Sequence, residues 1–484
     1  MIAVLALPLV TACGVVLARS ARQADAVNVA GALVTACGAL ALAVTGIVRA
    51  DDPAHGDWYV LDAAGGVFVG VIAVIGLLSA LVSPLQLAGQ GRGLVPAARA
   101  RSLYYFAFHA FWAALLAVPL VDNLALAWVL VEATTGGSAL LVAFSGKRSA
   151  LEAGWKYLVL TTFGLAVALL GIILLYTLTG PGGDLAALDW RSIAATAPTL
   201  PASGALTAFV LIIAGLATKV GWAPVHNWLP DAHSEAPPAV SALLSAALLP
   251  SVALVAWRVL QTLGPALDPG AGSALFLGVG LFSLAVAVPF LWQAQPFKRL
   301  LAYSSLEHMG VLAIGIGFAT PLATAGVVAH VAGHALAKSL GFYAAMPLLR
   351  HVPNAHREPI RGISAASPSS AAAVGVSLAA LAALPPSPLF VSELLILLGG
   401  LAAGETAVTI IAAALLALGF LGLAHALIEA LAGEPHPRRW RPGRSARQIA
   451  RLTVVCTAAM LVVTVLACLL PGSQTVEQLM RGVA

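Results

Sequence analysis

Charged side chains are scarce in this sequence of 484 residues. Only 9% of the residues are Asp, Glu, Lys or Arg, whereas 60% are hydrophobic, and the mean hydropathy is +0.96. Because soluble proteins carry about 25% charged residues, this composition excludes an ordinary soluble domain. The period-two alternation that membrane β-strands require is also missing. We therefore expect an all-α protein that crosses the membrane many times.

Cysteine is equally rare, and its placement excludes several kinds of cofactor site. The four cysteines stand far apart within apolar runs, at Cys13, Cys37, Cys456 and Cys468. Iron–sulfur clusters and structural zinc sites need closely grouped cysteines, or cysteines with histidines. The chain is therefore expected to hold no cofactor and no resident metal of its own.

Long apolar runs are what the sequence has in abundance. A spanning helix needs about 20 apolar residues. We predict fourteen spans, at residues 1–18, 27–48, 66–88, 103–121, 123–145, 154–178, 204–221, 239–262, 272–294, 300–318, 322–347, 369–402, 405–432 and 452–471.

The basic residues predict how these spans are oriented. Loops after odd-numbered spans carry most of the 25 Lys and Arg residues, whereas the opposite loops carry Arg49, Arg191 and Arg481 together with many acids. Basic loops remain in the cytoplasm. We therefore expect the basic loops to be cytoplasmic and both termini to lie outside.

Ionisable side chains also occur inside the predicted spans, where they are costly. Such groups usually face a protein interior or a water-filled path and pair with one another. The set that we predict to relay protons is Glu132, Lys156, Lys219, Glu307, His308, His330, His334, Lys338 and Glu393.

Two features of this set favour proton exchange. The chain has five lysines and twenty arginines, yet three of the lysines, at 156, 219 and 338, fall in spans. A desolvated lysine can release its proton, whereas arginine cannot. For Lys156, near the start of its span, the alternative is an amine that reaches the interface. In addition, His330, His334 and Lys338 recur every four residues, which predicts one stripe about 12 Å long on a helix.

Two spans contain breaks. The run 369–402 would form a helix of about 50 Å, longer than a bilayer core of about 30 Å, and "LPPSP" interrupts its middle. "GWAP" follows Lys219 in the seventh span. Interrupted helices at matching positions of opposed halves indicate an inverted repeat. We predict two five-helix repeats, spans 4–8 and 9–13, and a division of the chain into 1–102, 103–262, 263–432 and 433–484.

Polar residues cluster beyond the first break. We expect them either to admit protons or to support the broken helix, and for two of them, His226 and His233, the supporting role is the stronger alternative. The set is His226, Asp231, His233, Glu235 and Ser245.

Several stretches resemble one known family over residues 103–430. "ATKVGWAPVHNWLPDAHSEAPPAVSALLSAALLP", "EAGWKYLVLTTFG", "FKRLLAYSSLEHMG", "HALAKSLGFY" and "LPPSPLFVSELLIL" are similar to the antiporter-like subunits of respiratory complex I, multi-subunit cation/proton antiporters and membrane-bound hydrogenases. "HNWLPDAHSEAP" and "AYSSLEHMG" most resemble component F of hydrogenase-4, of the group 4 nickel-iron hydrogenases and formate hydrogenlyase.

The resemblance implies roles for individual residues. Glu132 and Lys219 would form a pair, His334 and Lys338 a central relay, and Glu393 the exit. Lys156, Glu307 and His308 match positions of the hydrogenase branch, with His330 one turn before His334. Ser245 departs from many complex I relatives, which have histidine there, and "PPSPLF" replaces the more usual Pro-Pro-Phe-Gly.

The resemblance also implies a function and partners. The chain would be a proton-translocating subunit of a redox complex in the bacterial cell membrane, and whether it counts as an enzyme stays open. Nickel-iron and iron–sulfur or flavin centres would lie in partner subunits, both membrane and peripheral. The transported ion would be the proton, with sodium as an alternative, and no nucleic acid is involved. Three alternatives remain: a sodium/proton antiporter subunit, the membrane subunit of an inorganic-carbon uptake system, and a structural anchor.

Overall fold

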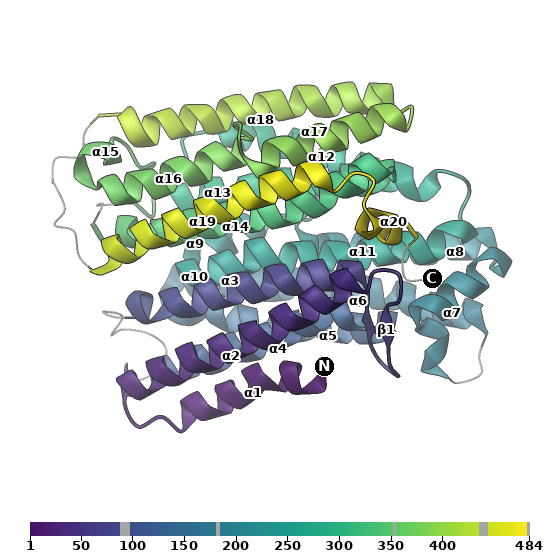
Figure 1. Cartoon of the computed structure of the whole chain (residues 1–484), viewed down its shortest axis with the longest axis horizontal. Coiled ribbons are helices and arrows are strands. Elements are labelled where there is room, and N and C mark those ends of the chain that lie inside the picture. The colour runs from purple at the N-terminus through teal and green to yellow at the C-terminus, as the bar shows by residue number, and fades with distance from the viewer. Residues whose placement is uncertain (88–96, 181–183, 352–354, 435–443, 482–484) are drawn as a thin grey trace.

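Long helices run side by side along the longest axis of the molecule (Figure 1). The computed structural model describes residues 1–87, 97–180, 184–351, 355–434 and 444–481. The first half contains a short antiparallel hairpin, β1 (Ala54–His55) and β2 (Val60–Leu61). Its helices are α1 (Ile2–Val16), α2 (Ala21–Val48), α3 (Ala63–Leu87), α4 (Ala97–Ala117), α5 (Leu124–Val142), α6 (Arg148–Thr179), α7 (Trp190–Thr196), α8 (Ala202–Val220), α9 (Leu229–Glu235), α10 (Pro238–Leu243) and α11 (Leu249–Leu263).

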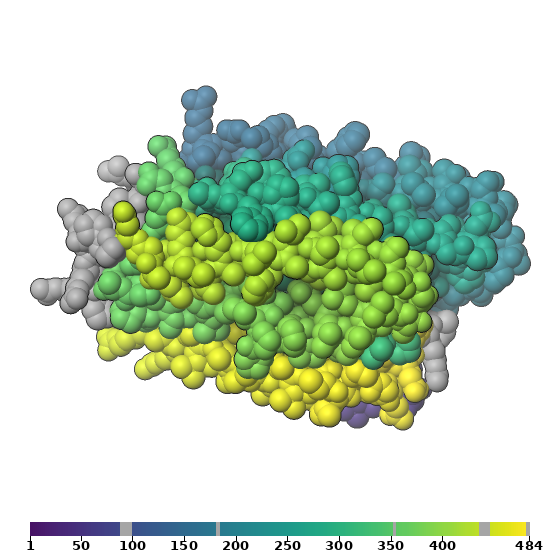
Figure 2. All heavy atoms as spheres, turned by 90° about the horizontal axis from the view of Figure 1, so that it is seen from above, coloured from purple at the N-terminus to yellow at the C-terminus, as the bar shows by residue number. Residues whose placement is uncertain are grey.

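The second half continues the bundle. A π-helical turn, η5 (Leu244–Leu248), joins α10 to α11 without a break. The helices of the second half are α12 (Ala271–Trp292), α13 (Phe297–Phe318), α14 (Pro321–His351), α15 (Ile363–Ala366), α16 (Pro368–Leu381), α17 (Pro388–Ala402), α18 (Thr406–Ala432), α19 (Arg444–Leu469) and α20 (Gln474–Arg481). From above, α18 crosses one face beside α16 and α17, and α19 lies next to them (Figure 2).

The predicted number of membrane crossings is confirmed. Among the described residues, eleven helical segments are long and apolar enough to span a membrane. They account for the fourteen predicted spans together with α14, the shorter apolar helix α1, and α16 and α17, which form one interrupted span. The N-terminus and the last helix, α20, lie at the same end of the bundle as β1 and α7 (Figure 1), as an even number of crossings requires. Part of the predicted basic loops, including Arg92, Arg438, Arg439 and Arg441, lies outside the described residues.

The two halves repeat one arrangement in opposite directions. The first repeat is α4, α5, α6, α8 with α9, and α10 with α11; the second is α12, α13, α14, α16 with α17, and α18. In Figure 1 the broken helix α8–α9 runs from right to left, whereas α16–α17 runs from left to right. This is the inverted repeat with two interrupted helices that the sequence predicts.

Polar groups freed at the first break find partners inside the protein. After α8 ends at Gly221, the indole of Trp228 donates to the Thr218 carbonyl at 2.6 Å, and that of Trp222 donates to the Met309 carbonyl at 2.7 Å. The Ala223 N–H donates to Ser283 Oγ at 3.1 Å. Irregular backbone is tolerated at membrane depth when it is enclosed in this way.

At the second break, side-chain hydroxyls hydrogen-bond the backbone groups that the interruption leaves free. Ser387 Oγ accepts the Phe390 N–H at 3.2 Å and so caps α17, while Thr464 Oγ1 donates to the Pro386 carbonyl at 3.0 Å. Each break contains a cis X–Pro peptide, Ala223–Pro224 in the first and Pro385–Pro386 in the second. Both interruptions are thus built parts of the fold that bring polar backbone into the bundle.

A buried ion pair fastens α11 to the start of α3. One Arg258 nitrogen donates to both carboxylate oxygens of Asp62, at 2.9 and 3.0 Å, and the side chains are 2% and 7% exposed. Asp62 also accepts the Gly65 N–H at 2.6 Å. The pair explains why an arginine stands within an apolar span.

We expect Arg258→Met to destabilise the protein strongly, because it leaves the Asp62 carboxylate buried without its cation. Breaking such a pair costs about 3–5 kcal/mol. Adding Asp62→Asn should recover much of the loss, since the amide oxygen still accepts from Gly65. Thermal unfolding in detergent measures both effects. A single variant as stable as the wild type would contradict the argument.

Candidate functional site

Lys219 lies where three helices of the first repeat meet. Its side chain, in the last turn of α8, is fully buried. The ammonium donates to Thr135 Oγ1 of α5 at 2.7 Å and to the Tyr157 hydroxyl of α6 at 2.5 Å. Tyr157 is itself hydrogen-bonded to Ser138 at 2.7 Å. The amine is therefore held by neutral hydroxyls, and it contacts no carboxylate among the residues that the structure describes.

Glu132 reaches Lys219 through a hydroxyl. Thr135 Oγ1 donates to Glu132 Oε2 at 3.3 Å while it accepts from Lys219. The other Glu132 oxygen accepts from Thr162 at 2.9 Å. The charge of Glu132 still acts on Lys219 electrostatically. A hydroxyl can donate and accept at once, so these three residues form one hydrogen-bonded chain.

Lys338 is a buried amine of the second repeat, on α14 rather than on the broken helix. It is fully buried and donates to the Leu301 carbonyl at 2.6 Å and to Ser304 Oγ. Ser305 Oγ donates to the same Leu301 carbonyl at 3.0 Å and lies 2.8 Å from Ser245 Oγ in η5. One carbonyl of α13 therefore connects Lys338 to Ser245, the predicted residue between the two halves.

The predicted histidine stripe is buried along α14 and gains a member from α13. His308 Nδ1 lies 3.2 Å from His330 Nε2, and His330 Nδ1 lies 2.9 Å from Ser392 Oγ of α17. The rings of His308 and His334 are 5.2 Å apart. No hydrogen-bond partner is found for either His334 nitrogen within the described part of the chain.

Two carboxylates complete the second group. Glu393, half-buried on α17, brings an oxygen within 4.8 Å of nitrogens of His308 and His330. Glu307 is 3% exposed and precedes His308 on α13. Glu307 stands on the second helix of its repeat, as Glu132 does in the other repeat. Each repeat thus contains a buried lysine and a glutamate, and no direct contact joins the two within the described residues.

Lys156 does not join this buried set. Its side chain is exposed, and the ammonium pairs with Glu152 at 2.7 Å and with Asp231 at 3.4 Å. Asp231 also pairs with Arg299 at 3.0 Å. Of the two alternatives for Lys156, the structure matches the amine that reaches the interface, because its long side chain extends from α6 toward the acids near the break. Its predicted part in proton relay stays a prediction.

The two histidines after the first break lie in its wall. His226 is half-buried, its carbonyl accepts the Leu229 N–H at 2.9 Å, and burial lowers the pKa of its imidazole. His233 is buried, stacks on Phe342 with ring centroids 5.5 Å apart, and accepts a hydrogen bond from Ser241 on its carbonyl. These contacts favour a supporting role for both.

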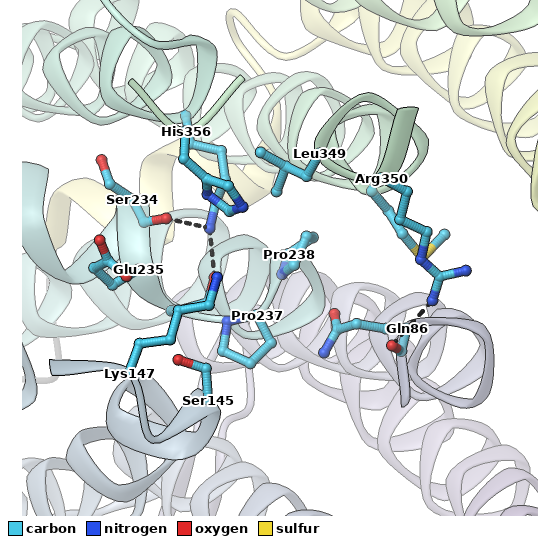
Figure 3. A pocket seen from close by; sticks show the side chains of 13 residues that line it. Gln86, Ser145, Lys147, Ser234, Glu235, Pro237, Pro238, Leu349, Arg350 and His356 are labelled. Atoms are coloured by element: carbon cyan, nitrogen blue, oxygen red, sulfur yellow. Dashed lines mark hydrogen bonds between the residues drawn. The ribbon is translucent and has the colours of Figure 1, made fainter. Parts of the chain in front are cut away.

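A polar cavity of about 420 Å³ opens at the end of the bundle opposite the chain termini. Glu235, predicted from the sequence, lines it together with Ser234, Lys147 and His356 (Figure 3). Its wall also holds Lys298, a residue that the sequence placed among the cytoplasmic loop charges.

Lys298 is a buried amine that the sequence did not reveal. Its ammonium donates to the Ser234 carbonyl at 2.9 Å and to the Ala236 carbonyl. Lys298 and Lys338 both act electrostatically on His233. The cavity therefore borders a buried amine that is hydrogen-bonded to the carbonyls of Ser234 and Ala236.

The hydroxyl groups that connect the titratable residues were not predicted, although the sequence contains a signal for them. Each stands within three residues of a predicted titratable group, in "EATT", "KY", "SSLEH" and "SE". Hydroxyls so placed can bridge groups too far apart for direct contact. The residues concerned are Thr135, Tyr157, Ser304, Ser305 and Ser392.

Known proteins share both the sequence and the fold. The model of the NADH:quinone oxidoreductase/Mrp antiporter transmembrane family matches residues 121–420. A hydrogenase-4 component F homolog of Methylacidiphilum infernorum is 33% identical over 399 residues, covering 80% of this chain and 82% of the relative. NADH-quinone oxidoreductase subunit N of Desulforudis audaxviator is 30% identical over 407 residues, covering 80% and 77%.

A solved structure extends the likeness to nearly the whole chain. A chain of the membrane-bound sulfane sulfur reductase, an archaeal respiratory membrane complex, superposes with a TM-score of 0.85 at 20% identity, covering 99% of this chain and 96% of that one. At this identity the likeness shows the fold alone, and the sequence relatives carry the family.

Proposed function

The chain belongs to the NADH:quinone oxidoreductase/Mrp antiporter transmembrane family, and from this membership we propose that it moves protons through the membrane for a redox complex of the hydrogenase-4 or complex I type. It is an antiporter-like membrane subunit. Its partners would be other membrane and peripheral subunits, and these would carry the nickel-iron and iron–sulfur or flavin centres.

The observation that carries this proposal is that each repeat contains a buried amine. Lys219 and Lys338 occupy the two opposed repeats, and each is held by oxygens of uncharged groups while a carboxylate acts on it from farther away. A neighbouring negative charge stabilises the protonated form of a buried lysine. Movement of Glu132 or Glu307 would therefore switch the lysine between holding and releasing it.

We propose that protons enter at the cytoplasmic end and leave near Glu393. The cavity of Figure 3 lies among the basic loops, which the positive-inside rule assigns to the cytoplasm, so both chain ends would lie outside. One hydrogen-bonded group ends at Ser138 and the next begins at Ser245. Water molecules bridging such groups hydrogen-bond almost as well as direct contacts, and we assign the link between them to water.

Ser245→Ala should slow proton translocation about tenfold, because it removes the hydroxyl that joins η5 to Ser305, and one such bond corresponds to about 1.4 kcal/mol of barrier. Ser251→Ala is the matched control, since this neighbouring buried serine only donates to the Ala247 carbonyl of its own helix. Dye quenching in inside-out vesicles measures both variants during redox turnover. Equal rates for the two variants would argue against a path through Ser245.

A sodium/proton antiporter subunit is the second candidate, because the matching family includes Mrp antiporters. The same vesicles separate the two functions. Redox-driven proton uptake in sodium-free medium supports the first proposal, whereas proton movement that requires sodium and no electron donor supports the second.

A further inference from the structure

His308, His330 and Glu393 converge from three different helices, α13, α14 and α17. One ligand atom from each lies within 4.8 Å of the others. We propose that this cluster binds a divalent cation of the zinc class, with water as a fourth ligand. Two histidines and a carboxylate with one open position form a recognised zinc ligand set.

The two histidines already have the spacing that a metal requires. Their nitrogens are 3.2 Å apart. Two nitrogens bound at about 2.0–2.1 Å to a tetrahedral zinc ion are about 3.3 Å apart. An oxygen of the half-buried Glu393 lies within 4.8 Å of both nitrogens and would move closer to take the third position. The metal would replace the single hydrogen bond that now joins the rings.

A neighbouring hydroxyl orients one of the ligands. Ser392 Oγ lies 2.9 Å from His330 Nδ1, which directs His330 Nε2 toward His308. Outer partners of this kind fix the tautomer of a metal-binding histidine, and losing them lowers metal affinity about 10–100-fold. The site therefore has a support in addition to its three ligands.

The donor atoms favour a dication of this class. A second buried carboxyl group, that of Glu307, directly precedes His308 in the chain, and its Oε2 finds no hydrogen-bond partner in the described ranges. Imidazole nitrogens select zinc-like metals over magnesium and calcium, which prefer oxygen ligands. The helix that carries Glu393, α17, lies on the outer face of the bundle (Figure 2).

A bound metal would occupy the nitrogen lone pairs through which His308 and His330 exchange protons. Zinc would therefore arrest translocation, a consequence that rests on the proposed function, whereas the binding itself does not.

Binding is tested on the full chain, purified in detergent and stripped with a chelator, by titrating Zn²⁺ against a chromophoric competitor. We expect one Zn²⁺ per chain, and at least a tenfold loss of affinity in His330→Ala and in Glu393→Gln. His109→Asn is the matched control, because this histidine is equally buried but lies on α4, away from the cluster, and it should bind as the wild type does. No stoichiometric binding, or equal affinity in all four proteins, would overturn the proposal.

A second variant separates a lost ligand from a lost fold. His330→Cys replaces one zinc ligand by another, so it should bind Zn²⁺ more tightly than His330→Ala does. Co²⁺ in place of Zn²⁺ should show a new thiolate-to-cobalt absorption band in this variant. If His330→Cys shows no such band and gives the same Co²⁺ spectrum as the wild type, His330 is not a ligand. None of these readouts involves transport, so their failure leaves the proton proposal standing, and the reverse also holds.

Discussion

Lys338→Ala is expected to abolish proton translocation, with a loss of at least about 100-fold, the lower range for removal of a group that transfers protons. Within the described residues, Lys338 is the only charged side chain that we find between the two histidines of α14 and the Ser304–Ser305 pair of α13. Dye quenching in inside-out vesicles, driven by the electron donor of the complex, measures the loss.

Lys338→Arg separates proton exchange from charge. Arginine keeps the positive charge but does not release its proton in a protein, so this variant should fail as alanine does. The amount of subunit in the membrane and the electron-transfer rate serve as controls, and both should persist at least in part. Full proton movement in Lys338→Arg would mean that Lys338 acts only as a fixed charge.

Thr135→Val is expected to slow translocation about 10- to 100-fold, because it removes the hydroxyl between Glu132 and Lys219 while keeping the shape of the side chain. The preceding residue provides a close control. Thr134 is equally buried, but its hydroxyl donates to the Val131 carbonyl of its own helix at 2.6 Å. Thr134→Val should therefore retain near wild-type rates.

The same dye-quenching assay measures both threonine variants side by side. A direct Glu132–Lys219 ion pair during turnover predicts a different result, in which both variants behave alike. That outcome would exclude Thr135 as the connecting group.

The membrane architecture was accessible from the sequence because it depends on features that are local in the chain. Apolar runs of spanning length, the proline-rich breaks and the parity of the basic loops each require only neighbouring residues. The stripe of His330, His334 and Lys338 follows from helix periodicity alone. Opposed breaks in α8–α9 and α16–α17 then imply the inverted repeat.

The contacts inside the site were less accessible, because they depend on how helices are rotated and how side chains extend between them. The sequence suggests that Glu132 and Lys219 pair, but only the packing of α5 against α6 and α8 places Thr135 between them. Two lysines, Lys156 and Lys298, illustrate this dependence on packing. Lys156 reaches outward to Glu152, whereas the segment between α9 and α10 covers Lys298 and supplies carbonyls to its amine.

The central claim is that the buried line through Lys219 and Lys338 carries the protons, and the ratio of protons moved to electrons transferred tests it most directly. Both quantities can be recorded together in vesicles that contain the complete complex. We predict that the ratio falls in Lys219→Ala and in Lys338→Ala while electrons still flow. A ratio that equals the wild-type value in both variants would contradict the account.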